Sequence, residues 1–246
     1  MSVAVVIPAK DEAARIAATI RAVRDASGVE AVVVVDDGST DDTARVAAAE
    51  GADVVRHTRN HGKADALMSG LGRLAALRRL GRLTPGVAVL FVDADLEESA
   101  AAALALVRPV ADGTAHLTIA VLPPQREAGG GHGLVVRLAR RGVEALTGWV
   151  PTQPLSGMRC LSPAAVTAAT PFARGWGVEV GMTVDVLLAG LTVREVPCEL
   201  HHRVTGTDWR AQLHRAAQLR DVALALGVRR LRRRRLGRSH RQGAPG

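Results

Sequence analysis

Short apolar runs alternate with longer segments of helical periodicity through the first half of the chain. Short β-branched runs bounded by turn residues predict buried strands, and they occupy residues 3–7, 31–35, 53–56, 87–92 and 117–122. The segments between them predict helices over about residues 11–25, 41–50, 62–80 and 99–110. This alternation predicts an α/β fold with a mostly parallel sheet and helices on both faces.

The alternation weakens after residue 123, where two glycine- and proline-rich stretches at residues 129–133 and 151–157 predict loops. Beyond them we predict helices over residues 163–169, 178–188 and about 209–226, and a strand over residues 192–196. We therefore expect one domain over residues 1–228, with halves at 1–122 and 123–228, followed by a tail at 229–246.

The formal net charge of +8 is concentrated in that tail. Residues 229–246 contain eight arginines and no acidic residue, so residues 1–228 are neutral overall. Such a run predicts a disordered, solvated end, or attraction to an anionic membrane face. Nucleic-acid binding is disfavoured, because no aromatic residues interleave with the arginines.

The cysteines and the length of the apolar stretches exclude several classes of protein. Cys160 and Cys198 are too few and too far apart for a disulfide framework or a zinc site. The chain enters a strand at once, and no apolar stretch approaches the ~18 residues that a spanning helix needs. We expect a soluble, cytoplasmic protein, with peripheral contact at the inner membrane face left open.

Acidic clusters follow two of the predicted strands. Residues 36–40 (Asp-Asp-Gly-Ser-Thr) end one apolar run, and residues 93–95 (Asp-Ala-Asp) end another. The carboxyl ends of parallel strands form the edge at which open α/β sheets bind ligands. Carboxylates there, together with substrate phosphates, suit Mg²⁺ or Mn²⁺. The pair predicts a site for a metal and a diphosphate.

Two further segments stand at strand-to-helix transitions on the same edge. Lys63 follows Gly62 at a helix start, and residues 8–12 (Pro-Ala-Lys-Asp-Glu) follow the first strand. A helix N-terminus beside a lysine suits phosphate.

In this order the four segments resemble the family 2 nucleotide-sugar glycosyltransferases of the GT-A fold, over roughly residues 3–97. The one departure is Asp11, where the family more commonly has Asn. The resemblance implies a UDP- or GDP-linked sugar donor, Asp93 and Asp95 at the ribose and the metal-bound diphosphate, and donor contacts from Pro8, Ala9, Glu12, Asp36, Gly38, Ser39, Lys63 and Ala94.

The second half is similar to the glucosyl-3-phosphoglycerate synthase and polyprenyl-phosphate sugar synthase branches, through residues 154–159, 175–181, 195–197 and 202–203. By this resemblance Glu179 faces the donor sugar and His202 completes the metal site. An anionic acceptor would meet Arg126, Arg159 and Arg203 near Gly157. Glu179 and Asp185 are the nearby candidates for a catalytic base.

We interpret the chain as a metal-dependent glycosyltransferase, with residues 1–122 binding the nucleotide sugar and 123–228 the acceptor. The acceptor is a small anion such as a phosphoglycerate or, as the alternative, a polyprenyl phosphate. The sequence does not decide whether the transfer retains or inverts the configuration of the sugar, nor whether the protein forms a homodimer. A nucleotidyltransferase is disfavoured because residues 8–12 lack glycine, and a non-catalytic adaptor that binds nucleotide or membrane stays open.

Overall fold

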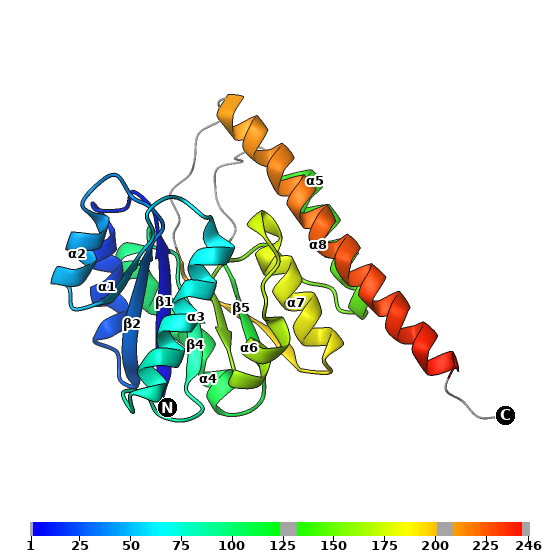
Figure 1. Ribbon diagram of the computed structural model, residues 1–246, viewed down its shortest axis with the longest axis horizontal. Coiled ribbons are helices and arrows are strands. Elements are labelled where there is room, and N and C mark those ends of the chain that lie inside the picture. Colours follow the sequence, from blue (N-terminus) through cyan, green and yellow to red (C-terminus); the bar gives the residue numbers. More distant parts are fainter. Residues whose placement is uncertain (1, 124–131, 201–208, 243–246) are drawn as a thin grey trace.

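The computed structural model of the protein describes residues 2–123, 132–200 and 209–242 (Figure 1). Its strands are β1 (Val3–Ala9), β2 (Val29–Asp36), β3 (Asp53–Arg56), β4 (Ala88–Phe91), β5 (Leu117–Val121), β6 (Arg159–Leu161) and β7 (Val193–Pro197). Its helices are α1 (Ile16–Arg24), α2 (Thr43–Ala49), α3 (Lys63–Arg79), η1 (Glu97–Leu106), α4 (Val107–Ala111), α5 (His132–Thr147), α6 (Pro163–Ala169), η2 (Gly175–Gly177), α7 (Val178–Leu188) and α8 (Trp209–Gln242).

The strands form one sheet in the order β3-β2-β1-β4-β6-β5-β7. All neighbouring strands in it are parallel except β6, which runs antiparallel to both β4 and β5. The predicted α/β fold with a mostly parallel sheet is therefore confirmed.

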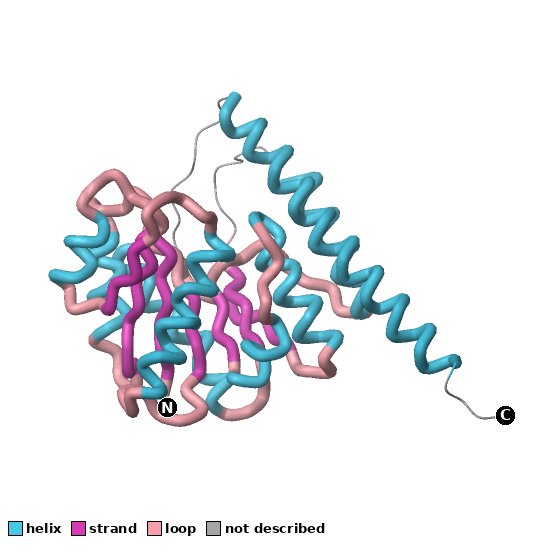
Figure 2. The backbone as a smooth tube through the Cα atoms, in the orientation of Figure 1, coloured by secondary structure: helices cyan, strands magenta, loops and turns pink. Residues whose placement is uncertain are grey.

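Alternation along the central strands builds a core on each face of the sheet. In β1, Val5 and Ile7 pack on one side with α1 and η1, while Val6 packs on the other with α3, α6 and α7. Because successive side chains of a strand point to opposite faces, a strand buried on both faces reads as a continuous apolar run. The helices on both faces are visible in Figure 2.

A third apolar cluster joins α5, α7 and α8, and includes Val143, Val184, Val222 and Leu226. In this layer α8 lies outermost and extends past the rest of the molecule (Figure 1). Within the described part of the chain, no helix has the length and apolarity to cross a bilayer.

Several predicted elements need correction. The first helix begins at Ile16 and not near residue 11, because Asp11 has a positive φ of 55°, outside the helical region, and residues 13–15 form a turn. The helix expected over residues 99–110 is a 3₁₀ segment, η1, followed by the short α4. Helix α5 and strand β6 were not predicted: α5 follows a glycine run, and β6 has only three residues.

The disordered tail predicted for residues 229–246 is wrong for residues 229–242, which continue α8. Arginine is a good helix former, and this part of the helix is anchored to the body. Arg229 is buried, and Arg233 donates a hydrogen bond to the carbonyl of Leu146 in α5 over 2.8 Å.

Candidate active site

Three charged side chains from different elements meet at the carboxyl edge of the central strands. Lys63 begins α3, Asp93 follows β4, and Glu179 lies in the first turn of α7. The Lys63 Nζ atom lies 2.7 Å from Asp93 Oδ1 and 3.4 Å from Glu179 Oε1. Burial alone would lower the pKa of Lys63, but the two carboxylates outweigh it and hold that pKa above its usual value. Lys63 is therefore a fixed positive charge shared by two acids.

Gly157 closes this cluster from the loop before β6. A Cβ atom at this position would clash with Lys63 Nζ and would lie 2.8 Å from Asp93 Oδ2. Only glycine lets the loop backbone approach the charged pair so closely. The structure thus brings a residue predicted for the acceptor against two residues predicted for the donor.

Asp36 ends β2 with a side chain that is fully buried. Its Oδ1 atom accepts a hydrogen bond from the backbone N–H of Ser39 over 2.9 Å. Its Oδ2 atom has no hydrogen-bond partner, although Arg56 Nε lies 3.2 Å away at ion-pair distance. A buried acceptor left without a hydrogen bond is costly, so this oxygen is suited to a ligand N–H.

The neighbouring Asp37 organises the chain that leads into α3, a role the sequence did not indicate. Its carboxylate accepts from the backbone N–H groups of His61 (2.8 Å) and Gly62 (2.7 Å). His57 lies between Asp37 Oδ1 (2.7 Å) and Ser69 Oγ (2.9 Å). Burial would raise the pKa of Asp37, but these donors outweigh it and hold the pKa below its usual value. Asp37 thereby fixes the segment directly before Lys63.

The remaining donor-site residues predicted from the sequence lie along the same edge. Pro8 and Ala9 end β1, where Ala9 pairs with Asp36 of β2. Gly38 has a φ of 71°, and the Ser39 hydroxyl accepts the backbone N–H of Asp11 over 2.9 Å. Ala94 is buried, and its carbonyl accepts from Thr19 Oγ1 over 2.9 Å.

Glu12 and Asp95 form the acidic side of this edge. Glu12 Oε2 accepts from Arg15 Nε over 2.8 Å. Burial raises the pKa of Glu12 against the opposing effect of Arg15, and the charge of Asp95 raises it further. Because the charge of Asp95 changes the pKa of Glu12, the two carboxylates lie within electrostatic reach of each other.

Half-buried carboxylates of this kind fit a hard divalent cation. Among the described residues, no three His, Cys, Asp or Glu side chains come together as a metal cluster. The predicted metal ligand His202 and the predicted acceptor residues Arg126 and Arg203 lie outside the described residues.

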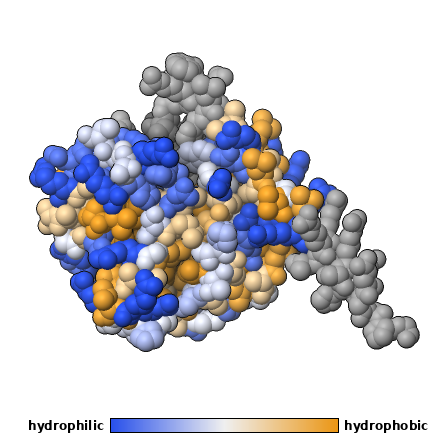
Figure 3. Space-filling view, in the orientation of Figure 1, coloured by the Kyte–Doolittle hydropathy of each residue, from blue (hydrophilic) through white to orange (hydrophobic). Residues whose placement is uncertain are grey.

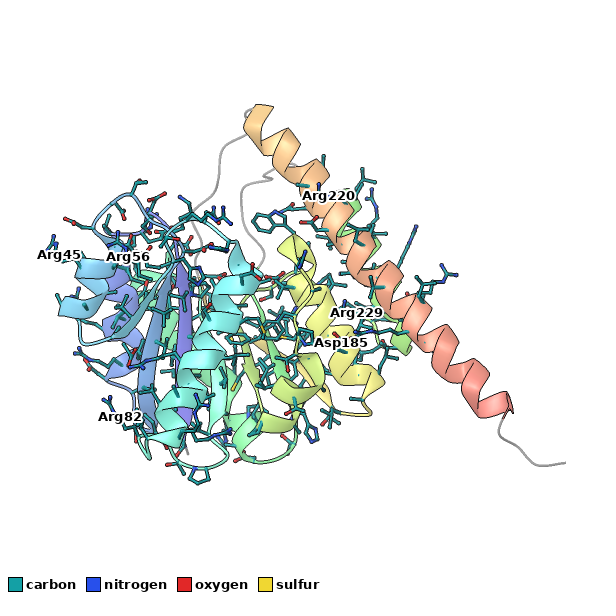
Figure 4. All side chains as sticks on the ribbon, viewed as in Figure 1. Arg45, Arg56, Arg82, Asp185, Arg220 and Arg229 are labelled. Atoms are coloured by element: carbon teal, nitrogen blue, oxygen red, sulfur yellow. The ribbon has the colours of Figure 1, made fainter. Side chains whose placement is uncertain are left out.

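Asp185, the other residue predicted as a candidate catalytic base, is engaged in an ion pair with another helix. It lies six residues after Glu179 on α7, about 9 Å along the helix axis, and pairs with Arg229 of α8 (Figure 4). Arg229 also donates to the carbonyl of Gly181 over 3.2 Å. Asp185 therefore joins two helices and does not face the donor-site residues.

Arg159, predicted to bind the acceptor, is fully buried. Its guanidinium donates to the carbonyls of Ser156 (2.8 Å) and Pro154 (3.1 Å) and to Thr183 Oγ1 (2.8 Å). Burial lowers its pKa to about 10, against the opposing charges of Glu179 and Glu195. Arg159 therefore supports the loop that carries Gly157, and its side chain has no exposed surface at which an acceptor would meet it.

Comparison with known proteins agrees with this geometry. The model of glycosyl transferase family 2 matches residues 4–135. An uncharacterised protein of Methanocaldococcus jannaschii is 30% identical over 199 residues, which cover 78% of this chain and 79% of that protein. The chain belongs to glycosyl transferase family 2 and is a nucleotide-sugar glycosyltransferase with a GT-A fold.

Solved structures of glucosyl-3-phosphoglycerate synthase from Mycobacterium tuberculosis are also similar. Its complex with Mn²⁺, uridine diphosphate and phosphoglyceric acid has a TM-score of 0.72 at 31% identity, covering 93% of this chain and 78% of that one. Its complex with Mg²⁺ and uridine diphosphate has a TM-score of 0.72 at 30% identity, covering 93% and 79%.

Proposed function

We propose that this enzyme transfers one sugar from a UDP- or GDP-linked donor to a small anionic acceptor such as a phosphoglycerate. The observation that carries the proposal is the meeting of Lys63, Asp93 and Glu179 beneath Gly157. It places one positive charge and two carboxylates at the edge of the sheet where α/β folds bind nucleotides. The M. tuberculosis enzyme, which binds UDP-glucose and phosphoglyceric acid with Mn²⁺, supports the choice of ligands.

Each donor-site residue then has a role that fits its surroundings. Asp36 Oδ2, buried without a hydrogen bond, would accept an N–H of the base. Pro8, Ala9, Glu12, Gly38, Ser39 and Ala94 would line the nucleoside along the same edge. Asp93, held by Lys63, would bind the ribose, and Lys63 would keep that carboxylate oriented.

Asp95, with His202, would hold Mg²⁺ or Mn²⁺, which supplies Lewis-acid stabilisation to the departing diphosphate when bound. The chain's own contribution is to place the sugar. Glu179, whose carboxylate is buried beside Lys63, would hold the sugar hydroxyls and remains the candidate base on the acceptor side. Arg126, Arg203 and the backbone at Gly157 would bind the acceptor anion.

The test is turnover of UDP-glucose and GDP-glucose with 3-phosphoglycerate and Mn²⁺, measured as release of nucleoside diphosphate. We expect acceptor-dependent release that Asp36→Asn weakens mainly through the KM of the donor, because the amide has a single acceptor oxygen. While Ser39 N–H occupies that oxygen, the NH₂ group at the other position cannot accept an N–H of the base. Glu179→Gln should lower kcat. Glu50→Gln is the matched control, because Glu50 directly follows α2 and pairs with Arg21 of α1, apart from the donor-site residues. No release with any donor would overturn the proposal.

A polyprenyl phosphate is the second candidate acceptor, because the large apolar side chains that α8 exposes would hold the enzyme at a membrane, where such a lipid resides. Replacing 3-phosphoglycerate by a short-chain polyprenyl phosphate in the same assay separates the two. A ratio of kcat/KM that favours the lipid phosphate would assign it as the acceptor and would contradict the phosphoglycerate.

A further inference from the structure

Helix α8 buries one face and exposes another that is apolar. Val222, Leu226 and Arg229 are buried against α5 and α7. On the outward side, Leu224, Val228 and Leu231 are 61%, 51% and 59% exposed. Their spacing of four and then three residues places them on one face of the helix. Figure 3 shows apolar surface gathered over the middle of α8.

Charge is distributed unevenly around this stripe. Helix α5 contains three arginines and one glutamate, and α8 contains eleven arginines and one aspartate. These two helices together carry a formal charge of +12, whereas the whole chain carries +8. The rest of the chain therefore carries −4. The molecule has one strongly basic layer on an otherwise acidic body.

We propose that the outward face of α8 docks onto an anionic lipid surface. Exposed Leu and Val side chains offer apolar area to bury in the lipid, and the arginines beside them add electrostatic attraction to anionic lipids; these two contributions set the strength of interfacial binding. Each basic residue near an anionic membrane contributes about 1 kcal/mol, or about fivefold in affinity. The acidic remainder of the chain would be repelled, which would orient the molecule with α8 towards the lipid.

Two other partners fit this face less well. A second copy docked through the same stripe would bring two layers of +12 together, and like charges across an interface oppose association. A nucleic acid would satisfy the arginines, but its phosphate backbone makes no use of exposed aliphatic side chains. The docking does not depend on which acceptor the enzyme uses, since the exposed stripe is on the side of α8 opposite to the face that packs on α7, the helix of Glu179.

The test is cosedimentation of the full chain with vesicles of phosphatidylcholine alone and of phosphatidylcholine with phosphatidylglycerol. We expect binding only to the anionic vesicles, and weaker binding at higher salt because the charges are screened. The pair Arg230→Gln and Arg232→Gln should bind about 25-fold more weakly. The pair Leu224→Gln and Leu231→Gln should bind at least about tenfold more weakly, since aliphatic burial is lost.

Matched controls come from the other side of the molecule. Leu80→Gln replaces an apolar residue that is 67% exposed at the end of α3, and Arg82→Gln replaces an exposed arginine close to it (Figure 4). Both controls should bind vesicles as the wild type does. All variants should keep the donor turnover of the wild type in solution, because the replaced side chains are exposed.

Absent binding, equal binding to both kinds of vesicle, or normal binding by the α8 variants would each overturn the proposal. Sedimentation velocity without lipid tests the alternative that the stripe joins two copies of the chain. If the wild type forms a dimer that Leu224→Gln and Leu231→Gln dissociate, and neither protein binds vesicles, the stripe is an interface between copies.

Discussion

Replacing Asp185 by alanine tests whether this carboxylate supports the fold or the chemistry. Asp185 and Arg229 have side chains that are 12% and 6% exposed, and they form an ion pair between α7 and α8. Removing one partner of a buried pair leaves an uncompensated charge and costs about 3–5 kcal/mol. Arg229 keeps the carbonyls of Gly181 and Ala225 as acceptors. We therefore expect a loss near 3 kcal/mol, at the low end of that range.

Urea denaturation followed by circular dichroism measures this loss as a lower midpoint at an unchanged slope. Asp42→Ala is the matched control, because Asp42 lies directly before α2, pairs with Arg45 at the exposed surface and makes no side-chain capping hydrogen bond. It should change the midpoint far less than Asp185→Ala. The double variant Asp185→Leu with Arg229→Met should recover most of the lost stability, because apolar groups of similar size can replace a buried pair.

Turnover of the Asp185→Ala enzyme distinguishes the two roles. A general base contributes about 10²–10⁴-fold to the rate, whereas a residue that only joins helices leaves kcat close to the wild-type value while the enzyme is folded. A hundredfold loss of kcat in a variant of unchanged stability would refute our assignment and restore Asp185 as a candidate base.

Three further outcomes follow from the structure. Gly157→Ala should reduce donor turnover more than stability, since its Cβ atom would displace Lys63 or Asp93; normal kinetics would show that the loop can yield. The pKa of Asp37 is lowered in the folded state, so the stability lost in Asp37→Asn should be largest near neutral pH and shrink as the pH falls below 3.8, measured by urea denaturation. Burial raises the pKa of Cys160 to about 12 and that of Cys198 to about 11, so thiol reagents at mildly alkaline pH should label them only as the chain unfolds, and rapid labelling of the native protein would contradict their burial.

The parts of the fold that could be predicted are those in which one physical signal dominates. Runs such as residues 32–35 are apolar on both faces, so they indicate a central strand without ambiguity. Strand β6 has three residues, and its antiparallel placement between β4 and β5 depends entirely on tertiary pairing. The charge of the arginine run suggests a solvated, disordered end, whereas the helix that contains the run is held by contacts that begin before it, at Val222, and extend to Arg233.

The residues of the candidate site also divide into those that could be predicted from the sequence and those that could not. Asp36, Lys63 and Asp93 stand at strand ends or a helix start, so their placement along one edge follows from the topology of a parallel sheet. The positions of Asp185 and Arg159 could not be predicted from the sequence. A charged residue close to a sequence motif can face a ligand, but it can equally pair with a distant helix, as Asp185 does, or with loop carbonyls, as Arg159 does. Asp37 belongs to the acidic cluster at residues 36–40, but the sequence did not indicate its structural role, since its partners are mainly backbone N–H groups and a histidine twenty residues away.

The charges at the edge of the sheet lead to one consequence for the donor. Lys63 is shared by Asp93 and Glu179, so it can neutralise only one of these two carboxylates. Asp95 adds a further acid, close enough to raise the pKa of Glu12. A donor diphosphate would bring more negative charge to an edge that is already acidic, and like charges at short range oppose binding. The proposed divalent cation therefore has an electrostatic role in binding as well as in the departure of the diphosphate, because without it the carboxylates that position the donor would also repel it.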